Sequence, residues 1–465
     1  MEGETTDCKD SPASPPAVRR FLDALFAGLD EAGVRYCVSR NFEGLPERVG
    51  KDVDLLVAPG EVNAAERCVL GAIESSDWTL ISRPKRFGWR SYRLAHAADA
   101  TFFHVDLVDR LAWRGVRWMD ERSALTNRRA HRGLFIPDPA AQGVILLWKD
   151  FAQTAAIRAA YQPRIRDAAR ADPRAFRAYL TWGLGARLAG VVMEAIETED
   201  WDRLERDCGR FRRGFLLRAV RRNPIEPLWG GARFLWGHLR AFLGRPTGIF
   251  LVLIGPDGSG KTTVARAVGA SLERLFARQE FYHARLGRLP EIKAYRNAFL
   301  RLAGRKPPPP PDPASPHTHD RPPHGLARSL VHVLYYGLDH FLAHWKVRRL
   351  RARGDLIALD RYFYDWFVQD YYRRTPRWLL PVLQAVLPRP DLVAYPRSRP
   401  EVIHARKPEL TVEQIARQGQ RFEQLVNNMA NAMTVSTDSS VDETAGAICA
   451  RIVQIMAERS RGGRA

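Results

Sequence analysis

The sequence predicts a multidomain α/β protein with three structured parts: an α/β module, a helical segment and a domain built on a parallel sheet. The chain has 465 residues, which at ~150 residues per domain suits two or three domains. Short β-like runs separated by helical segments occupy residues 17–125, and long amphipathic runs occupy residues 126–245. A continuous apolar run then opens the last part, residues 246–465.

The first module follows an N-terminal tail, residues 1–16, which is polar and rich in proline and is expected to be disordered. Apolar residues at helical spacing begin at Val18 and predict the first helix. Short apolar runs after it predict strands separated by turns. These runs are YCVS at 36–39, DLLV at 54–57 and FFHVDLV at 102–108.

The central segment, residues 126–245, has apolar positions at three- and four-residue spacing, which predicts that it is all helical. Its last run, LWGGARFLWGHLRAFLGRP, is strongly apolar but contains Arg233, His238 and Arg240. It is therefore expected to be an amphipathic helix of the core, with a membrane-interface helix as the alternative. No run of 18 or more apolar residues occurs, so no transmembrane segment is expected.

The last part, residues 246–465, begins with IFLVLIG, which is typical of a strand buried in a parallel sheet. A glycine-rich turn and a helical run follow it. Residues 306–324 are rich in proline and pack as neither helix nor strand, so we expect a solvated loop inserted into this domain.

The glycine-rich turn matches the P-loop pattern G-x-x-x-x-G-K-[ST] in its required place between a strand and a helix. Its glycines let backbone N–H groups turn toward phosphates, and the helix N-terminus adds a positive dipole. Lys261 is expected to reach the β- and γ-phosphates of ATP, and Thr262 to ligate Mg²⁺. The expected nucleotide-binding residues are Gly255, Pro256, Asp257, Gly258, Ser259, Gly260, Lys261, Thr262 and Thr263.

A second apolar run, DLIALDRY, predicts a strand that ends in Asp360, Arg361 and Tyr362. Ligands bind at the carboxyl edge of parallel sheets. Asp360 is therefore expected to hold Mg²⁺, and Arg361 to bind a phosphoryl group through two parallel hydrogen bonds. A structural salt bridge between such residues is the alternative.

A third apolar run, DLVAY at 391–395, precedes a helix that ends in Arg406 and Lys407, next to Pro408. Two cations beside a proline suggest a lid that closes over a transferring phosphoryl group. The alternative is a helix C-terminus whose cations interact with the helix dipole.

Together, GPDGSGKTT, DRY and ARKPELT resemble the thymidylate kinase-like family of P-loop kinases over roughly residues 248–460. The resemblance implies ATP- and Mg²⁺-dependent phosphoryl transfer to a small phosphorylated acceptor. It also implies roles in catalysis for Lys261, Asp360, Arg361, Arg406 and Lys407, and contacts to the acceptor for Asp257, Arg361 and Tyr362.

Three positions depart from that family's pattern. Asp365 stands where thymidylate kinases typically have a serine, and Asp370 where they typically have a glutamine. His340 stands where that family tends to have an arginine. The acceptor is therefore expected to be another nucleoside monophosphate-like compound or a sugar phosphate rather than thymidylate.

In the first module, KDVDLLV places Asp52 and Asp54 on one face of a strand, because side chains alternate with period two. Asp106, on a neighbouring strand, is expected to complete a Mg²⁺ site suited to attack on an α-phosphate. Polar strand ends in a purely structural domain are the alternative.

The D-x-D pattern followed by HVDL resembles the nucleotidyltransferase fold of polymerase-β-like proteins, whose helical continuation would correspond to residues 126–245. Ser39 and Arg40 stand where that family usually has a Gly-Gly or Gly-Ser turn, and they are candidate phosphate contacts. The pair of modules resembles proteins encoded with bacterial surface-polysaccharide or secondary-metabolite gene clusters.

The formal charge of +20 and the pI near 10.2 would suit nucleic acid, an anionic membrane surface or phosphorylated substrates. Only nine of the 72 basic residues are lysine, and no aromatic-interleaved basic motif occurs, so no specific nucleic-acid partner is expected. The five cysteines lack metal or disulfide spacing and the N-terminus lacks signal-peptide features, which predicts a cytoplasmic location. A homodimer is left open.

Two other functions stay open beside the kinase. One is a nucleotide-gated regulator or assembly ATPase whose P-loop hydrolyses ATP slowly. The other is nucleotidyl transfer carried by the N-terminal module, with the P-loop domain in an ancillary role.

Overall fold

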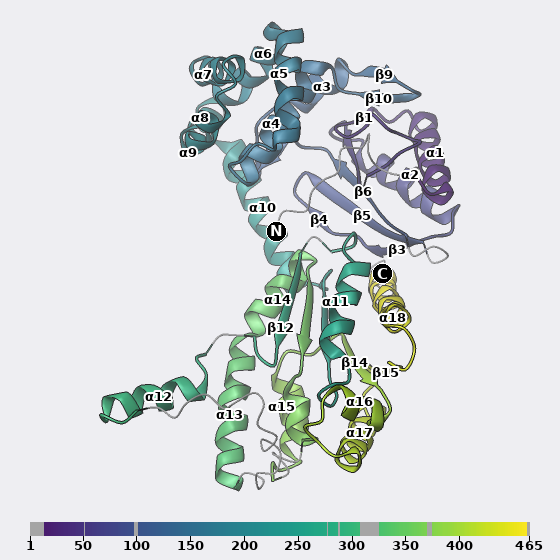
Figure 1. The fold of residues 1–465 in the computed structure, drawn as a ribbon. Coiled ribbons are helices and arrows are strands. Elements are labelled where there is room, and N and C mark those ends of the chain that lie inside the picture. Colours follow the sequence, from purple (N-terminus) through teal and green to yellow (C-terminus); the bar gives the residue numbers. More distant parts are fainter. Residues whose placement is uncertain are drawn as a thin grey trace. The chain divides into compact units, whose positions relative to one another are not determined.

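The computed structural model describes residues 14–50, 52–96, 101–276, 278–286, 289–306, 325–369 and 374–462. It divides into two compact units, Met1–Leu243 with Arg459–Ala465, and Gly244–Glu458 (Figure 1). Most of the expected tail (1–16) and of the proline-rich insertion (306–324) lies outside the described residues, as do Lys51 and Asp370. Among the helices that the structure describes, none is long and apolar enough to cross a membrane.

The first unit is built on a six-stranded sheet with the order β1-β2-β6-β5-β3 and β4 paired to β5. The pair β2 and β6 is parallel and the other pairs are antiparallel. The strands are β1 Tyr36–Val38, β2 Asp52–Val57, β3 Trp78–Ser82, β4 Lys85–Arg86, β5 Trp89–His96 and β6 Thr101–Val108.

Alternation along β2 decides what each face of this sheet contacts. Val53, Leu55 and Val57 are buried in one cluster with residues of α1 Pro16–Glu31 and α2 Val62–Glu74. Leu56 points to the opposite face and is buried in a second cluster with residues of the helical segment. Asp52 and Asp54 share the face of Leu56, because side chains alternate with period two.

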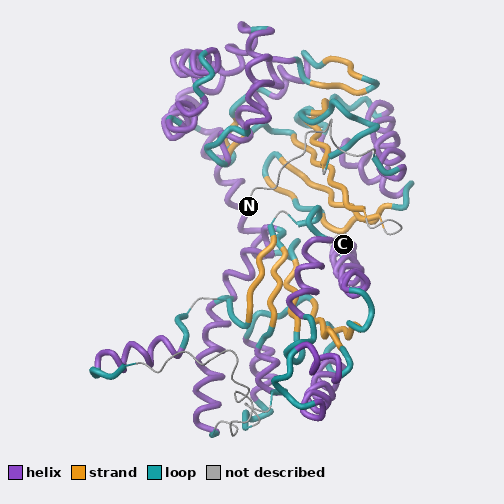
Figure 2. The backbone as a smooth tube through the Cα atoms, in the orientation of Figure 1, coloured by secondary structure: helices purple, strands orange, loops and turns teal. Residues whose placement is uncertain are grey.

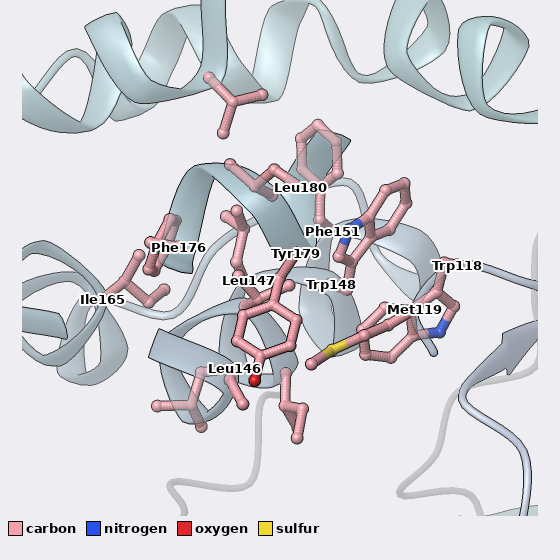
Figure 3. Close-up of a cluster of buried hydrophobic side chains, with 14 of the residues drawn as sticks. Trp118, Met119, Leu146, Leu147, Trp148, Phe151, Ile165, Phe176, Tyr179 and Leu180 are labelled. Carbon is pink, nitrogen blue, oxygen red and sulfur yellow. The ribbon is translucent and has the colours of Figure 1, made fainter. Parts of the chain in front are cut away.

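Most remaining elements of the first unit pack around this second cluster, in which Trp118, Trp148 and Phe151 lie together (Figure 3). The aromatic rings bury large apolar areas between the helices, which supports their packing. The exception is α10, expected to be an amphipathic helix of the core: Gly230 is its only buried residue, and large apolar side chains such as Trp229 and Trp236 are exposed. The elements are β7 Ala112–Trp113, β8 Val116–Arg117, α3 Glu121–Thr126, β9 Arg129–His131, β10 Leu134–Ile136, α4 Pro139–Gln153, η1 Ala159–Tyr161, α5 Gln162–Ala171, α6 Pro173–Leu184, α7 Ala186–Glu197, α8 Trp201–Arg206, α9 Cys208–Arg222 and α10 Ile225–Leu243.

The prediction that residues 126–245 are all helical is wrong near their start. Strands β9 and β10 form a hairpin there, with His131 paired to Leu134 across a two-residue turn. Arg132 and Gly133 in that turn have φ of 48° and 80°, the left-handed pair that matches the twist of a tight hairpin. The strands have three residues each, too few to show a period in the sequence.

The second unit is a five-stranded, wholly parallel sheet with the order β12-β13-β11-β14-β15. Figure 2 shows these strands between helices on both faces. The strands are β11 Ile249–Leu253, β12 Gln279–His283, β13 Leu356–Asp360, β14 Leu392–Arg397 and β15 Ala432–Ser436. The helices are α11 Lys261–Ser271, α12 Ile292–Leu302, α13 Leu326–Leu342, α14 His344–Arg353, η3 Phe363–Phe367, α15 Leu379–Val386, α16 Pro400–Arg406, α17 Val412–Asn427 and α18 Val441–Arg461.

The three apolar runs recognised in the sequence are β11, β13 and β14, the three inner strands of this sheet. In β11, Phe250 and Val252 are buried with residues of α14 and α17 on one face. Parallel strands buried on both faces read as continuous apolar runs, which is why these strands were predictable.

Candidate functional site

The loop between β11 and α11 turns sharply at three glycines. Gly255, Gly258 and Gly260 have φ of 143°, 85° and 87°. Residues with a Cβ atom rarely adopt these backbone angles. A Cβ at Gly258 would also lie 3.2 Å from the carbonyl oxygen of Ile403. Loop and helix together present backbone N–H groups and a helix N-terminus, an arrangement suited to an anion.

Lys261 begins α11 and is almost fully buried. Its ammonium donates hydrogen bonds to the carbonyl oxygens of Gly255, at 3.0 Å, and Pro256, at 2.7 Å. Burial, and then the neighbouring Arg361, lower the pKa of Lys261 below its ordinary value. The ammonium also lies 3.9 Å from Oδ1 of Asp257. Its two hydrogen-bond acceptors are neutral carbonyl groups, which a charged phosphate group can replace.

Thr262 and Asp360 meet at the carboxyl ends of β11 and β13. The Thr262 hydroxyl donates to Oδ2 of Asp360 at 2.6 Å, and Nδ1 of His283 lies 3.5 Å from the same oxygen. Oδ1 of Asp360 is buried and has no hydrogen-bond partner in the part of the chain that the structure describes. A hydroxyl and a carboxylate with an unused oxygen fit the oxygen ligands that Mg²⁺ prefers.

Arg361 lies between two carboxylates. Its guanidinium donates to Oδ1 of Asp257 in the P-loop and, from Nη1 at 3.3 Å, to Oδ2 of Asp365 in η3. Its backbone has φ of 72°, an uncommon conformation for a residue with a Cβ, and such strain is frequent at functional sites. The turn directs Arg361 back across the sheet edge to the P-loop.

The two carboxylates respond differently to their surroundings. Burial would raise the pKa of Asp257, but Arg361, Lys261 and Lys407 lower it below its ordinary value. Burial raises the pKa of Asp365 to about 7 although Arg361 and Lys261 oppose the change. One oxygen of Asp365 is buried and has no hydrogen-bond partner in the described residues.

The two cations of the expected lid both line the cavity at the P-loop. Lys407 follows α16, and its Nζ lies 3.8 Å from Oδ2 of Asp257 and 3.1 Å from Glu409. Arg406 is the last residue of α16. Tyr362, expected at the acceptor, is instead buried, and its hydroxyl donates to the carbonyl oxygen of Pro388 at 2.9 Å.

The cavity has a volume of about 520 Å³. Sequence reasoning missed the lining residues that come from the two outer strands: Thr437, Ser439 and Val441 follow β15, and His283 ends β12. If these two strands had been recognised in the sequence, their carboxyl ends would have been placed beside those of β11 and β13, where ligands of parallel sheets bind. The lining residues are Asp257, Gly258, Gly260, Lys261, Thr262, Thr263, Val264, His283, Asp360, Arg406, Lys407, Thr437, Ser439, Val441 and Thr444.

His340, one of the departures from the family pattern, lies in α13 and is almost fully buried. Its ring packs edge-on against Tyr362, with the centroids 4.8 Å apart. Burial lowers the pKa of His340 to about 4, and neither ring nitrogen has a hydrogen-bond partner among the described residues. A neutral imidazole therefore stands behind Tyr362.

In the first unit the structure brings together the three carboxylates expected to bind a metal. Asp54 in β2 is directly opposite Asp106 in β6, and oxygens of Asp52, Asp54 and Asp106 lie within 4.8 Å of one another. The indole of Trp89 donates to Oδ2 of Asp106 at 3.0 Å. Burial, and then Asp54, raise the pKa of Asp106 to about 6.

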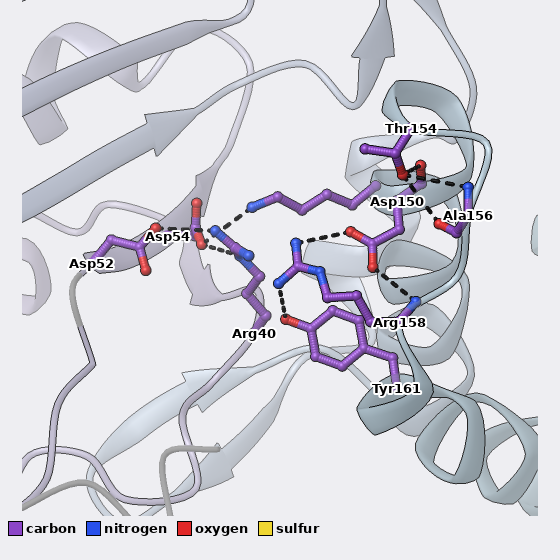
Figure 4. A network of polar contacts seen from close by, with 9 residues as sticks. Arg40, Asp52, Asp54, Asp150, Thr154, Ala156, Arg158 and Tyr161 are labelled. Atoms are coloured by element: carbon purple, nitrogen blue, oxygen red, sulfur yellow. Dashed lines mark hydrogen bonds and ion pairs between the residues drawn. The ribbon is translucent and has the colours of Figure 1, made fainter. Parts of the chain in front are cut away.

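Two cations contact the same carboxylates. Arg40 donates from Nε to Asp54 and from Nη2 to Asp52, at 3.1 Å, and Nζ of Lys149 lies 3.8 Å from Oδ2 of Asp54. Figure 4 shows Arg40 between the two aspartates and a second network in which Arg158 donates to Asp150 at 2.9 Å. Arg40, a candidate phosphate contact in the sequence, thus binds the carboxylates.

No protein-family model and no curated protein matches the chain. Among solved structures, thymidylate kinase from Ehrlichia chaffeensis is similar at 14% identity and a TM-score of 0.30, over 45% of this chain and 100% of that one. A thymidylate kinase from Candida albicans is similar at 15% identity and a TM-score of 0.32, over 46% and 95%. The roles of individual residues therefore depend on the geometry of this chain.

Proposed function

We propose that the second unit is a kinase that uses ATP and Mg²⁺ to transfer a γ-phosphoryl group to a small phosphorylated acceptor. The observation that supports this most is the meeting of three features at one edge of a parallel sheet. These features are the buried P-loop lysine, the Thr262 and Asp360 pair, and Arg361 held against the P-loop. Phosphoryl transfer needs mainly positioning and positive charge, and this edge supplies both.

On the donor side, the backbone N–H groups of the loop and the ammonium of Lys261 bind the phosphates. Lys261 exchanges its two carbonyl acceptors for phosphate oxygens, which are charged and bind an ammonium more strongly. Thr262 and Asp360 hold Mg²⁺, which when bound neutralises charge on the phosphates.

On the acceptor side, Arg361 binds the acceptor's phosphate, and Asp257 accepts a hydrogen bond from one of its hydroxyls. The guanidinium has five N–H donors in a planar fork, so a phosphate can bind it in two places. Arg406 and Lys407 bring positive charge to the transferring group from α16. The acceptor class is a nucleoside monophosphate-like compound or a sugar phosphate, with Tyr362 and His340 behind it.

The test is ADP formation from ATP and Mg²⁺ in the presence of a panel of nucleoside monophosphates, nucleosides and sugar phosphates. One acceptor class should stimulate ADP formation, and Lys261→Ala should lower the stimulated rate by roughly 10²- to 10³-fold, as losing one group that stabilises transition-state charge does. Lys293→Ala, an exposed lysine on α12, is the matched control and should keep the rate.

Slow ADP formation that no acceptor stimulates would contradict the kinase and favour a nucleotide-gated regulator. Pyrophosphate release from ATP that survives Lys261→Ala would instead favour nucleotidyl transfer by the first unit.

A further inference from the structure

We propose that Arg40 is the resident cation of the Asp52, Asp54 and Asp106 carboxylates, and that a divalent cation can enter only when Arg40 leaves. The proposal concerns the first unit and does not depend on kinase activity in the second. It sets a condition on the expected Mg²⁺ site, because the chain itself competes for the metal's ligands.

The backbone places Arg40 at the carboxylates. It lies one residue beyond Ser39, which follows β1, and the N–H of Ser39 donates to the carbonyl oxygen of Asp54 at 2.9 Å, which extends the pairing of β1 with β2 by one residue. The next residue, Asn41, has φ of 54° and turns the chain away. Arg40 is 8% exposed, so its guanidinium is held within the sheet edge rather than in solvent.

Its bonds use the oxygens that a metal would need. Nε and Nη2 donate to Oδ2 of Asp54 and Oδ2 of Asp52, so one planar group bridges the two carboxylates of the D-x-D pattern (Figure 4). A divalent cation bound to the same oxygens would lie next to the guanidinium, and like charges at such a distance repel strongly. Metal and Arg40 therefore exclude each other.

Charge in the cluster is already largely balanced. Lys149 in α4 lies 3.8 Å from Oδ2 of Asp54, so two cations contact a group of three carboxylates. Unpaired buried carboxylates bind metals tightly because a cation relieves their repulsion, and here Arg40 and Lys149 already relieve it. Oδ1 of Asp106 is buried and lacks a hydrogen-bond partner in the described chain.

The experiment counts Mn²⁺ bound by the full chain without nucleotide, using electron paramagnetic resonance of free Mn²⁺. Wild type and Asp106→Asn should bind the same number of ions. Arg40→Met, which keeps an unbranched apolar stem and removes the charge, should bind one more ion than wild type, with an affinity at least roughly tenfold above any residual binding by wild type at this site, since tenfold is a modest change in an ionic interaction. Arg40→Lys should resemble wild type, and Arg40→Met with Asp106→Asn should lose the added ion.

A Mn²⁺ ion that wild type binds and Asp106→Asn loses would overturn the proposal. The comparison of wild type with Asp106→Asn needs no Arg40 variant, so it tests the proposal even if Arg40→Met does not fold. An Arg40→Met chain that keeps the wild-type far-UV circular dichroism and gains no ion would also overturn it. Any Mn²⁺ bound at the P-loop is present in all of these variants, so it does not affect the differences in the number of bound ions.

Discussion

Arg361 in the second unit and Arg40 in the first lie in similar surroundings, each between two carboxylates. Arg361 contacts Asp257 and Asp365, and Arg40 bridges Asp52 and Asp54. A guanidinium held in this way is oriented before any ligand arrives, which lowers the entropy lost on binding. In the second unit this orientation holds Arg361 at the P-loop, and in the first it places Arg40 on the oxygens that a metal would need.

Asp365 allows a prediction about pH, because burial raises its pKa from 3.8 to about 7. The folded chain then binds this proton more tightly than the unfolded chain does. The contribution of Asp365 to the free energy of unfolding should therefore be most favourable below about pH 4 and should fall as pH rises to about 7, by on the order of 3 kcal/mol. Asp365→Asn should remove this part of the pH dependence.

Urea unfolding of the second unit at about pH 5 and about pH 8 measures this effect. The variant should gain stability relative to wild type at the higher pH. Asp442→Asn, on the exposed start of α18, is the control. Equal differences between Asp365→Asn and wild type at both pH values would contradict the raised pKa.

Single residues were predictable from the sequence where backbone periodicity fixes them. Asp52 and Asp54 share a face because strands alternate, and Asp360 ends a buried strand. The partners of Arg40 and Arg361 were not predictable, since long side chains reach several neighbours and the choice depends on the folded surroundings. Tyr362 shows the same limit, because its position after a strand did not reveal that its ring is buried.

At the scale of elements, exposure explains which strands the sequence revealed. The inner strands β11, β13 and β14 are buried along nearly their whole length. The edge strands β12 and β15 keep several residues partly or fully exposed, so neither forms a continuous apolar run. The missed cavity residues His283 and Thr437 end or follow these edge strands.

A close backbone approach holds α10 in the first unit. A Cβ at Gly230 would lie 2.0 Å from the carbonyl oxygen of Gly115 in the β7–β8 hairpin, and the ion pair of Arg117 with Glu226 lies nearby. Gly230→Ala should force the helix from the hairpin and destabilise the unit by about 1–3 kcal/mol, the usual cost of overpacking.

Gly231→Ala is the matched control for this contact, because a Cβ there meets nothing within 4 Å. It should leave stability unchanged or raise it by up to ~1 kcal/mol through helix propensity. Urea midpoints of the two variants check the prediction. Similar midpoints for both would show that the approach of α10 to the hairpin contributes little.

At the scale of the whole molecule, each unit has its own buried core. The first unit has two buried clusters, one on the face of its sheet that includes Leu55 and one among its helices that includes Trp148. The second unit's cluster is centred on the inner strands of its parallel sheet. The first unit joins the strands and the helical segment that sequence patterns had separated near residue 125. A change of periodicity marks a change of element type, and it does not show whether two segments share a core.

Separate cores predict separate thermal transitions for the two units, and a nucleotide should move only one of them. Mg²⁺ with ADP binds the P-loop in the proposed function, so it stabilises the folded second unit by about 2.7 kcal/mol when the ligand is at 100 times its Kd. Differential scanning calorimetry should show one transition rising with ligand concentration and the other fixed. Lys261→Ala should abolish the rise and Lys293→Ala should keep it. A rise in both transitions would mean that the units unfold as one cooperative body, and a nucleotide effect on the first unit's transition alone would move the nucleotide site to the Asp52 and Asp54 cluster.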